Sequence, residues 1–271
     1  GVSQDLDTKQ LIPGQTLIDN FDNCRLKEFV RKVFDERLNT ARDMSRRESR
    51  CLKTEYADHL RGVDKTSSFA RTKLRALLGD PVSFSDINLL GCSIRDPRAL
   101  LDSGFRKPIE IAVGPTHGDL HANNVVVTHD DYPRIIDFAW GSRDAHIVKD
   151  YALMELSLRY LLFPRFYSLE QQNKVDNALL YENGHVDIPS LTASSPLRPS
   201  YVRMAIMIGE IRAAVRLAIG PDRNFDEFFA SQFLILMGLL KYPSYDFHIS
   251  VRYAGMLASK LWEGVYGVNG E

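Results

Sequence analysis

The sequence predicts a mainly α-helical fold that contains one small β-hairpin. Apolar side chains recur every three to four residues along most of the chain, which is the period of an amphipathic helix. One pair of short apolar segments, Val125–Val127 and Arg134–Ile136, is separated by a polar turn and predicts the hairpin. We therefore expect residues 16–78 and 150–266 to be mainly helical.

The first half of the chain is expected to hold helices over about 23–42 and 45–78. The second of these has few β-branched residues and many good helix formers, with a break near Gly62. Residues 79–115 are rich in proline and glycine, so we expect loops there and one short helix at Asp96–Leu101. The apolar residues that define the first helix are Leu26, Phe29, Val30, Val33, Phe34 and Leu38.

The second half should contain a series of helices separated by short breaks. The helix over 201–219 is expected to end at Gly220-Pro221, because glycine after the last turn followed by proline is a common stop signal. The most apolar stretch, 228–240, is shorter than the ~20 residues that a membrane span needs, so we expect a buried helix. The remaining expected helices cover 151–163, 169–180, 226–241 and 248–265, with a loop over 183–199 and with Trp262 and Tyr266 as core residues.

Charge and cysteine content exclude several classes of function. The 271 residues carry a formal net charge of −1, so neither nucleic acid nor an anionic membrane is an expected partner. Three widely spaced cysteines, Cys24, Cys51 and Cys92, argue for a reducing compartment and against a disulfide framework. The N-terminal residues lack the basic and apolar segments of a signal peptide. We therefore expect a cytoplasmic protein.

Residues 116–141 carry the strongest functional signal in the chain. Asp119, Asn124 and Asp137 are three hard oxygen donors, and the predicted hairpin lies between the second and the third. Because a hairpin returns its far end beside its start, Asp137 should face the loop that holds the other two. Carboxylate and amide oxygens gathered in this way suit Mg²⁺ and leave coordination positions open for phosphate.

This block resembles the active site of the aminoglycoside phosphotransferase and choline kinase branch of the protein-kinase-like fold. Residues 117–124 are similar to the catalytic loop, with Gly118 where protein kinases usually have arginine and His121 where they usually have lysine. Residues 136–139, Ile-Asp-Phe-Ala, are similar to the metal-binding motif, with alanine in place of glycine. The two motifs occur in the family's order and are joined by a hairpin.

The resemblance implies a role for each matching residue. Asp119 would accept or orient the proton of a substrate hydroxyl. Asn124 and Asp137 would hold the Mg²⁺ that neutralises charge between phosphates. His117 would support the loop by packing and hydrogen bonding, and His121 would either brace the loop or touch a phosphate.

Asp150 precedes an apolar helical run and has two possible roles. It could be an N-cap whose side chain accepts free backbone N–H groups of its own helix. The resemblance implies that it also fixes the backbone of the catalytic loop.

The resemblance also implies that residues 1–271 form a single helical C-terminal lobe. Residues 1–15 would be the lead-in from an interlobe hinge, and Thr16–Phe21 would begin the first helix. The glycine-rich phosphate loop and strand lysine of a complete kinase-like enzyme have no counterpart in residues 1–116. We therefore expect an N-terminal lobe or fused domain outside this chain to complete the nucleotide pocket.

The leading hypothesis is a Mg²⁺-dependent phosphotransferase lobe that transfers the γ-phosphate of ATP or GTP to a small-molecule hydroxyl. The alternative is a catalytically silent binding or regulatory module in a multidomain signalling or defence protein. A metallophosphoesterase built on Gly118–His121 would also need a later Gly-Asn-His segment, which is missing from the sequence. A zinc site at His117, Asp119 and His121 suits the nearby oxygen donors less well than Mg²⁺ does.

Two groups of charged residues are further candidates. Acidic groups near the site would suit a cationic acceptor, although a surface or capping role is the favoured interpretation of each. These are Asp144, Glu155 and Glu210. A basic cluster in the first half is expected to be a solvated helix face rather than an anion site. It comprises Arg42, Arg46, Arg47 and Arg50.

Overall fold

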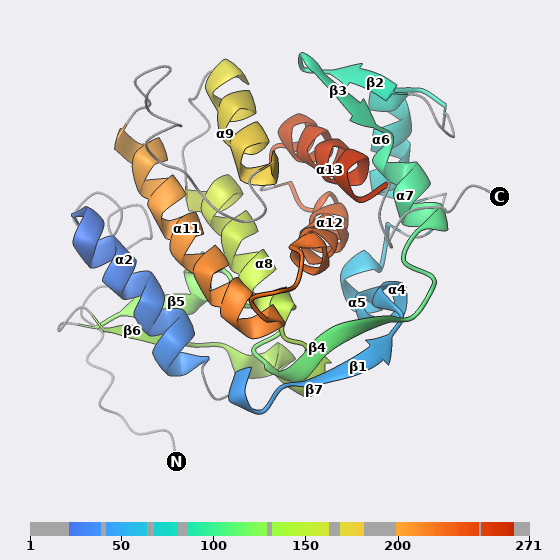
Figure 1. Ribbon diagram of the computed structural model, residues 1–271. Coiled ribbons are helices and arrows are strands. Elements are labelled where there is room, and N and C mark those ends of the chain that lie inside the picture. Colours follow the sequence, from blue (N-terminus) through green and yellow to red (C-terminus); the bar gives the residue numbers. More distant parts are fainter. Residues whose placement is uncertain are drawn as a thin grey trace.

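The computed structural model describes most of the chain, and its elements form a mainly helical body with small antiparallel sheets (Figure 1). The expectations for 1–21, for most of the loop over 183–199 and for Tyr266 lie outside the described residues. Those described are 22–38, 42–63, 65, 68–80, 86–128, 132–162, 169–181, 199–243 and 245–262.

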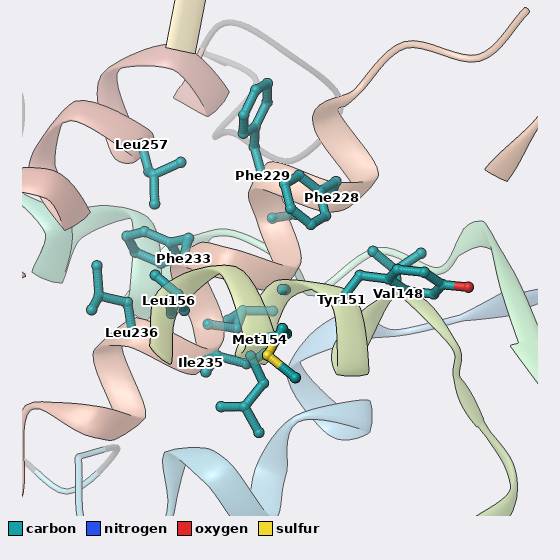
Figure 2. Close-up of a cluster of buried hydrophobic side chains, with 14 of the residues drawn as sticks. Val148, Tyr151, Met154, Leu156, Phe228, Phe229, Phe233, Ile235, Leu236 and Leu257 are labelled. Carbon is teal, nitrogen blue, oxygen red and sulfur yellow. The ribbon is translucent and has the colours of Figure 1, made fainter. Parts of the chain in front are cut away.

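Helices α8 (Val148–Ser157) and α12 (Asp226–Leu239) pack against each other at the centre of the molecule (Figure 1). α13 (Phe247–Trp262) packs on α12. Apolar side chains from all three meet in the core shown in Figure 2, where Phe228, Phe233 and Leu257 are labelled. Both α8 and α12 are buried around nearly their whole circumference, as expected of helices that are apolar on every face. The element that carries Asp150 is therefore rigidly held.

A second layer of helices covers this core. α2 (Asn23–Arg31) continues into the π-helix η1 (Lys32–Arg37) and lies beside α11 (Pro199–Ile219) (Figure 1). Asp22 caps α2, because its carboxylate accepts the N–H groups of Cys24 and Arg25. The other elements on this side are η4 (Leu158–Leu162), a π-helix that continues α8, and α9 (Leu169–Tyr181). These helices confirm the periodicity-based predictions to within a few residues.

A three-stranded antiparallel sheet leads the chain into the candidate site. Its order is β1-β4-β7, with β4 (Ile109–Thr116) in the centre, β1 (Arg46–Arg50) on one side and β7 (Ser142–His146) on the other. The pairing of β4 with β7 is irregular between Gly114 and Thr116. Such irregularities bend a strand and redirect the residues that follow it, and here the next residues form the loop beginning at His117.

The sheet corrects two of the sequence predictions. Residues 46–50 form β1, although 45–78 was predicted to be helical; only α4 (Leu52–Glu55), α5 (Ala57–Leu60) and α6 (Phe69–Leu78) are helices. Pairing with β4 overrides the local helix propensity of this arginine-rich segment. The strands in 79–115 were also missed. They are β2 (Asp86–Leu89), β3 (Cys92–Arg95) and β4.

Three members of the basic cluster, Arg46, Arg47 and Arg50, correspondingly lie on a strand and not on a helix face. Arg46 and Arg50 both bind the carboxylate of Asp144, at 2.6 and 2.7 Å. Arg47 reaches across to the buried Glu227 at 2.9 Å. These ion pairs hold the edge strand β1 to its neighbours and leave its arginines paired with carboxylates rather than available as an anion site.

The hairpin and the short helix before it confirm the prediction. β5 (Val125–Val127) pairs with β6 (Pro133–Ile135), so the second strand begins and ends one residue earlier than predicted. The Ile136 N–H continues the ladder to the Asn124 carbonyl at 2.9 Å. α7 (Pro97–Ser103) occupies the predicted short helix, with Asp96 as its N-cap.

Candidate active site

The candidate site lies where the hairpin closes, between the loop 117–124 and the segment 136–141. The first loop follows the central strand β4 and ends in a short 3₁₀-helix, η2 (Ala122–Asn124). The second follows β6 and contains another 3₁₀-helix, η3 (Phe138–Trp140). Several direct contacts join these two segments. They confirm the prediction that the hairpin brings the two motifs together.

Asp150 anchors the first loop from the core. Its carboxylate is buried and accepts the backbone N–H groups of His117 at 2.6 Å and Gly118 at 2.8 Å. Burial raises the pKa of Asp150, and the two N–H donors act against this shift. Asp150 is the third residue of α8, whose preceding residue, Ile147, makes no side-chain cap. The N-cap interpretation is therefore wrong, and the two hydrogen bonds join Asp150 to the backbone of the loop instead.

His117 connects the two loops. Its Nε2 lies 2.8 Å from the Ile136 carbonyl oxygen, and its Nδ1 accepts the Asp119 N–H at 3.3 Å. Because Nδ1 is an acceptor, the proton must be on Nε2, which donates to the carbonyl. The ring also packs 4.5 Å from the ring of Phe138. His117 is almost fully buried and supports the loop, as predicted.

Gly118 makes a backbone contact that no larger residue could make. A Cβ at this position would lie 2.1 Å from the carbonyl oxygen of Trp140, and the φ angle of Gly118 is +82°. Both facts require glycine, because a side chain would collide with backbone and this φ is unfavourable for L-residues. The glycine that distinguishes this loop from the protein-kinase pattern thus lets the loop 117–124 touch the segment 136–141.

The Asn124 side chain is buried and has a fixed orientation. Its Nδ2 donates to the Asp119 carbonyl oxygen at 2.8 Å, which leaves Oδ1 as the atom with metal-binding capacity. Its neighbour Asn123 is exposed. Of the two asparagines, only Asn124 is held in the loop by the contacts of its side chain among the described residues.

His121 braces the loop. Its Nδ1 accepts the Asn123 N–H at 3.2 Å, which caps η2. Its Nε2 therefore carries the proton when the ring is neutral, and this atom lies 3.7 Å from the Asp119 carboxylate. His121 is thus placed against the carboxylate that it flanks, in agreement with the bracing role.

The two aspartates of the site influence each other electrostatically. Burial raises the pKa of Asp119, and the charge of Asp137 acts in the same direction, whereas His121 and His117 oppose it. Asp137 has a left-handed backbone, with φ +61° and ψ +64°. Within the described part of the chain no hydrogen bond or ion pair holds its carboxylate. An aspartate with a left-handed backbone, beside a second aspartate whose pKa is raised, is typical of a functional site.

The donor atoms of Asp119, Asn124 and Asp137 are all oxygens, the kind of ligand that Mg²⁺ prefers. Two carboxylates that repel each other and an amide oxygen held by its own hydrogen bond would all be stabilised by Mg²⁺, which prefers oxygen ligands. Among the described residues, no group of three or more His, Cys, Asp or Glu could hold a metal. Both ring nitrogens of His117 are already engaged. The arrangement thus argues against the zinc alternative.

The acidic residues considered for a cationic acceptor are engaged elsewhere. Glu155 is fully buried and binds Arg212 at 2.8 Å. Glu210 pairs with Arg31 at 2.7 Å. With Asp144 bound by the β1 arginines, none of the three has a free carboxylate for a substrate. Glu155 is neither a surface nor a capping residue, because it neutralises arginines inside the core.

Two residues near the site carried no signal in the sequence. The hydroxyl of Ser157, at the end of α8, accepts the Ala122 N–H at 2.9 Å. Tyr245 lies close enough to Asp119 for that carboxylate to contribute, after burial, to raising the tyrosine pKa to about 12. In the sequence, Ser157 lies in an apolar helical segment and Tyr245 lies between two apolar ones, so both would be interpreted as core residues. Only the spacing of Ser157, seven residues after Asp150, could have placed it on the same helix face.

Comparison with known proteins identifies the family but not an activity. The model of the family described as Ternary complex associated domain 9 matches residues 18–235, which is more than three quarters of the chain. The chain belongs to this family. No curated protein and no solved structure matches it. The match to Ternary complex associated domain 9 includes both loops of the candidate site and α8, and it ends within α12. No helix among its described residues is long and apolar enough to cross a membrane.

Proposed function

We propose that this chain is the C-terminal lobe of a kinase-like, Mg²⁺- and nucleotide-dependent phosphotransferase that acts on a small-molecule hydroxyl. One observation carries the proposal. Asp150 fixes the backbone of the loop that holds Asp119, a hydrogen bond from His117 joins this loop to the segment that holds Asp137, and burial raises the pKa of Asp119. A carboxylate held in this way is a stronger base than an ordinary surface aspartate.

Asp119 is the proposed base. Its carboxylate would accept the proton of the acceptor hydroxyl, and its raised pKa brings its basicity closer to neutral pH. The hydrogen bond between its own N–H and His117 and the hydrogen bond from Asn124 to its carbonyl oxygen fix its backbone. A positioned base of this kind contributes about 10²- to 10⁴-fold to the rate.

Asn124 and Asp137 are the proposed metal ligands, through Oδ1 and the carboxylate. When bound, Mg²⁺ would neutralise the charge that develops between the phosphates of ATP or GTP. The contacts of His117 with Ile136 and of Gly118 with Trp140 keep the base and the metal ligands in a fixed mutual position. Phosphoryl transfer depends mainly on such positioning.

An activity measurement tests this proposal. The lobe alone should show negligible ATP turnover, because the sequence of residues 1–116 contains no glycine-rich loop of the kind that covers the phosphates. We propose that an N-terminal lobe or fused domain completes the pocket. When this lobe is joined to that domain or mixed with it, the complex should turn over nucleotide in the presence of a hydroxyl acceptor. Asp119→Ala should then reduce the rate at least ~10²-fold, and Asp137→Asn should abolish Mg²⁺-dependent nucleotide binding without unfolding. Robust turnover by residues 1–271 alone would contradict the proposed division of labour.

A second candidate function is a catalytically silent binding module. The family description refers to a ternary complex, and the segment around Asp137 exposes three large apolar side chains. They are Ile136, Phe138 and Trp140, which are 40%, 60% and 66% exposed. Exposed apolar patches of this kind often contact other proteins. A completed protein that binds a protein partner through this segment, yet neither binds Mg²⁺–nucleotide nor phosphorylates any of a broad set of hydroxyl acceptors, would favour this candidate.

A further inference from the structure

The hydroxyl of Ser157 makes two hydrogen bonds with distinct consequences. It donates to the Met154 carbonyl oxygen at 2.8 Å, and it accepts the Ala122 N–H at 2.9 Å. The first bond fixes the rotamer of the serine on its own helix. The second satisfies an N–H at the start of η2, where a helix leaves its first donors without internal partners. The side chain is fully buried, so water cannot replace it.

Asp150 and Ser157 lie on the same face of α8. Seven residues are close to two full turns, or about 10.5 Å along the axis. Asp150 binds the start of the loop, at His117 and Gly118. Ser157 binds its end, at Ala122. The helix therefore holds the loop at two points, and Asp119 lies between them.

The anchor at Ala122 is closest to the proposed metal ligand. Asn124 is two residues further along the same 3₁₀-helix, and its side chain turns back to the Asp119 carbonyl oxygen. η2 also packs against η4, which continues directly from Ser157. A shift of Ala122 would therefore move the amide oxygen of Asn124 relative to Asp137.

We propose that Ser157 is a positioning residue that sets the orientation of Asn124 in the metal site. It acts through the N–H of Ala122 and does not itself touch the metal. The effect on metal affinity rests on the proposed function above, whereas the hydrogen bond to Ala122 does not.

Amide hydrogen exchange, resolved by residue in NMR spectra of the full chain, tests the anchor itself. In Ser157→Ala and Ser157→Cys the Ala122 amide should exchange much faster than in the wild type. Ser157→Thr keeps a hydroxyl and should preserve slow exchange. Ser250→Ala is a matched control, because Ser250 is equally buried and its hydroxyl has no hydrogen-bond partner among the described residues. Unchanged protection of Ala122 in folded alanine and cysteine variants would overturn the proposal.

Mn²⁺ binding, followed by electron paramagnetic resonance, tests the consequence for the site. Loss of a group that orients a metal ligand typically lowers metal affinity about 10- to 100-fold. We expect this loss in Ser157→Ala and Ser157→Cys, and near-wild-type affinity in Ser157→Thr and Ser250→Ala. Equal Mn²⁺ affinity in all four variants would overturn the positioning role. If the alanine and cysteine variants do not fold, the Ser157→Thr variant decides. Weakened Mn²⁺ binding by a folded Ser157→Thr variant whose Ala122 amide is still protected would also overturn the positioning role.

The two measurements also separate this inference from the proposed function. A wild-type chain that shows no Mn²⁺ binding at Asp119, Asn124 and Asp137 contradicts the metal site, and with it the consequence for affinity. The exchange of the Ala122 amide would still decide whether Ser157 fixes the loop.

Discussion

Replacing Gly118 by alanine should destabilise the protein more than the same replacement at a positive-φ glycine with open space around it. The new Cβ would lie 2.1 Å from the carbonyl oxygen of Trp140, so one backbone segment would have to move by almost an ångström to reach a tolerable contact. The φ of +82° costs about 1–2 kcal/mol for a residue with a side chain. Overpacking adds about 1–3 kcal/mol. The expected loss in the free energy of unfolding is therefore about 2–5 kcal/mol.

Gly62→Ala is the matched control for this experiment. Gly62 has a φ of +91°, and no atom of the described residues lies within 4 Å of the position that a Cβ would take there. It should lose only the conformational part, about 1–2 kcal/mol. Urea unfolding of the two variants under identical conditions gives the difference directly. Equal losses would refute the close contact between the loop 117–124 and the segment 136–141.

Two further variants test the charges in and around the site. Asp119→Asn should be more stable than the wild type at pH 7. The pKa of Asp119 is raised in the folded state, so the wild-type protein loses folding stability as the pH rises through that pKa, and the variant does not. Urea midpoints of the two proteins, measured from pH 4 to pH 8, should converge in acid, and a less stable variant at pH 7 would contradict this. Arg212→Met should cost about 3–5 kcal/mol, because it leaves Glu155 buried without its closest partner. Glu210→Gln, at an ion pair whose other member, Arg31, is 60% exposed, should cost no more than about 1 kcal/mol. A larger loss would show that this pair is less screened by water than the exposure of Arg31 indicates.

Local patterns predicted the helices and the meeting of the two motifs. The apolar residues of α2 and α11 follow helical spacing, and the hairpin between Val125 and Ile135 has a short-range cause. Both features depend on residues that are neighbours in the sequence. This is why the loop that holds Asp119 and the segment that holds Asp137 could be predicted to meet.

Long-range pairing decided the features that were missed. β1 contains three arginines and a glutamate, and it is a strand only because it pairs with β4, more than fifty residues away. Arg47 is held by Glu227, which is further still. Ser157 was missed for a related reason, because its partner Ala122 lies on another element. Propensity and periodicity contain no information about such partners.

The most direct test of the central claim is an anomalous difference map from crystals of the full chain soaked with Mn²⁺ and a non-hydrolysable ATP analogue. We predict one strong peak between Asn124 Oδ1 and the Asp137 carboxylate, at about the 2.1 Å typical of Mg²⁺–oxygen bonds, with Asp119 beside it and phosphate oxygens completing the coordination. The peak should be absent in Asp137→Asn. No peak at these residues in the wild type, or a peak only at surface carboxylates such as Asp144, would contradict the account.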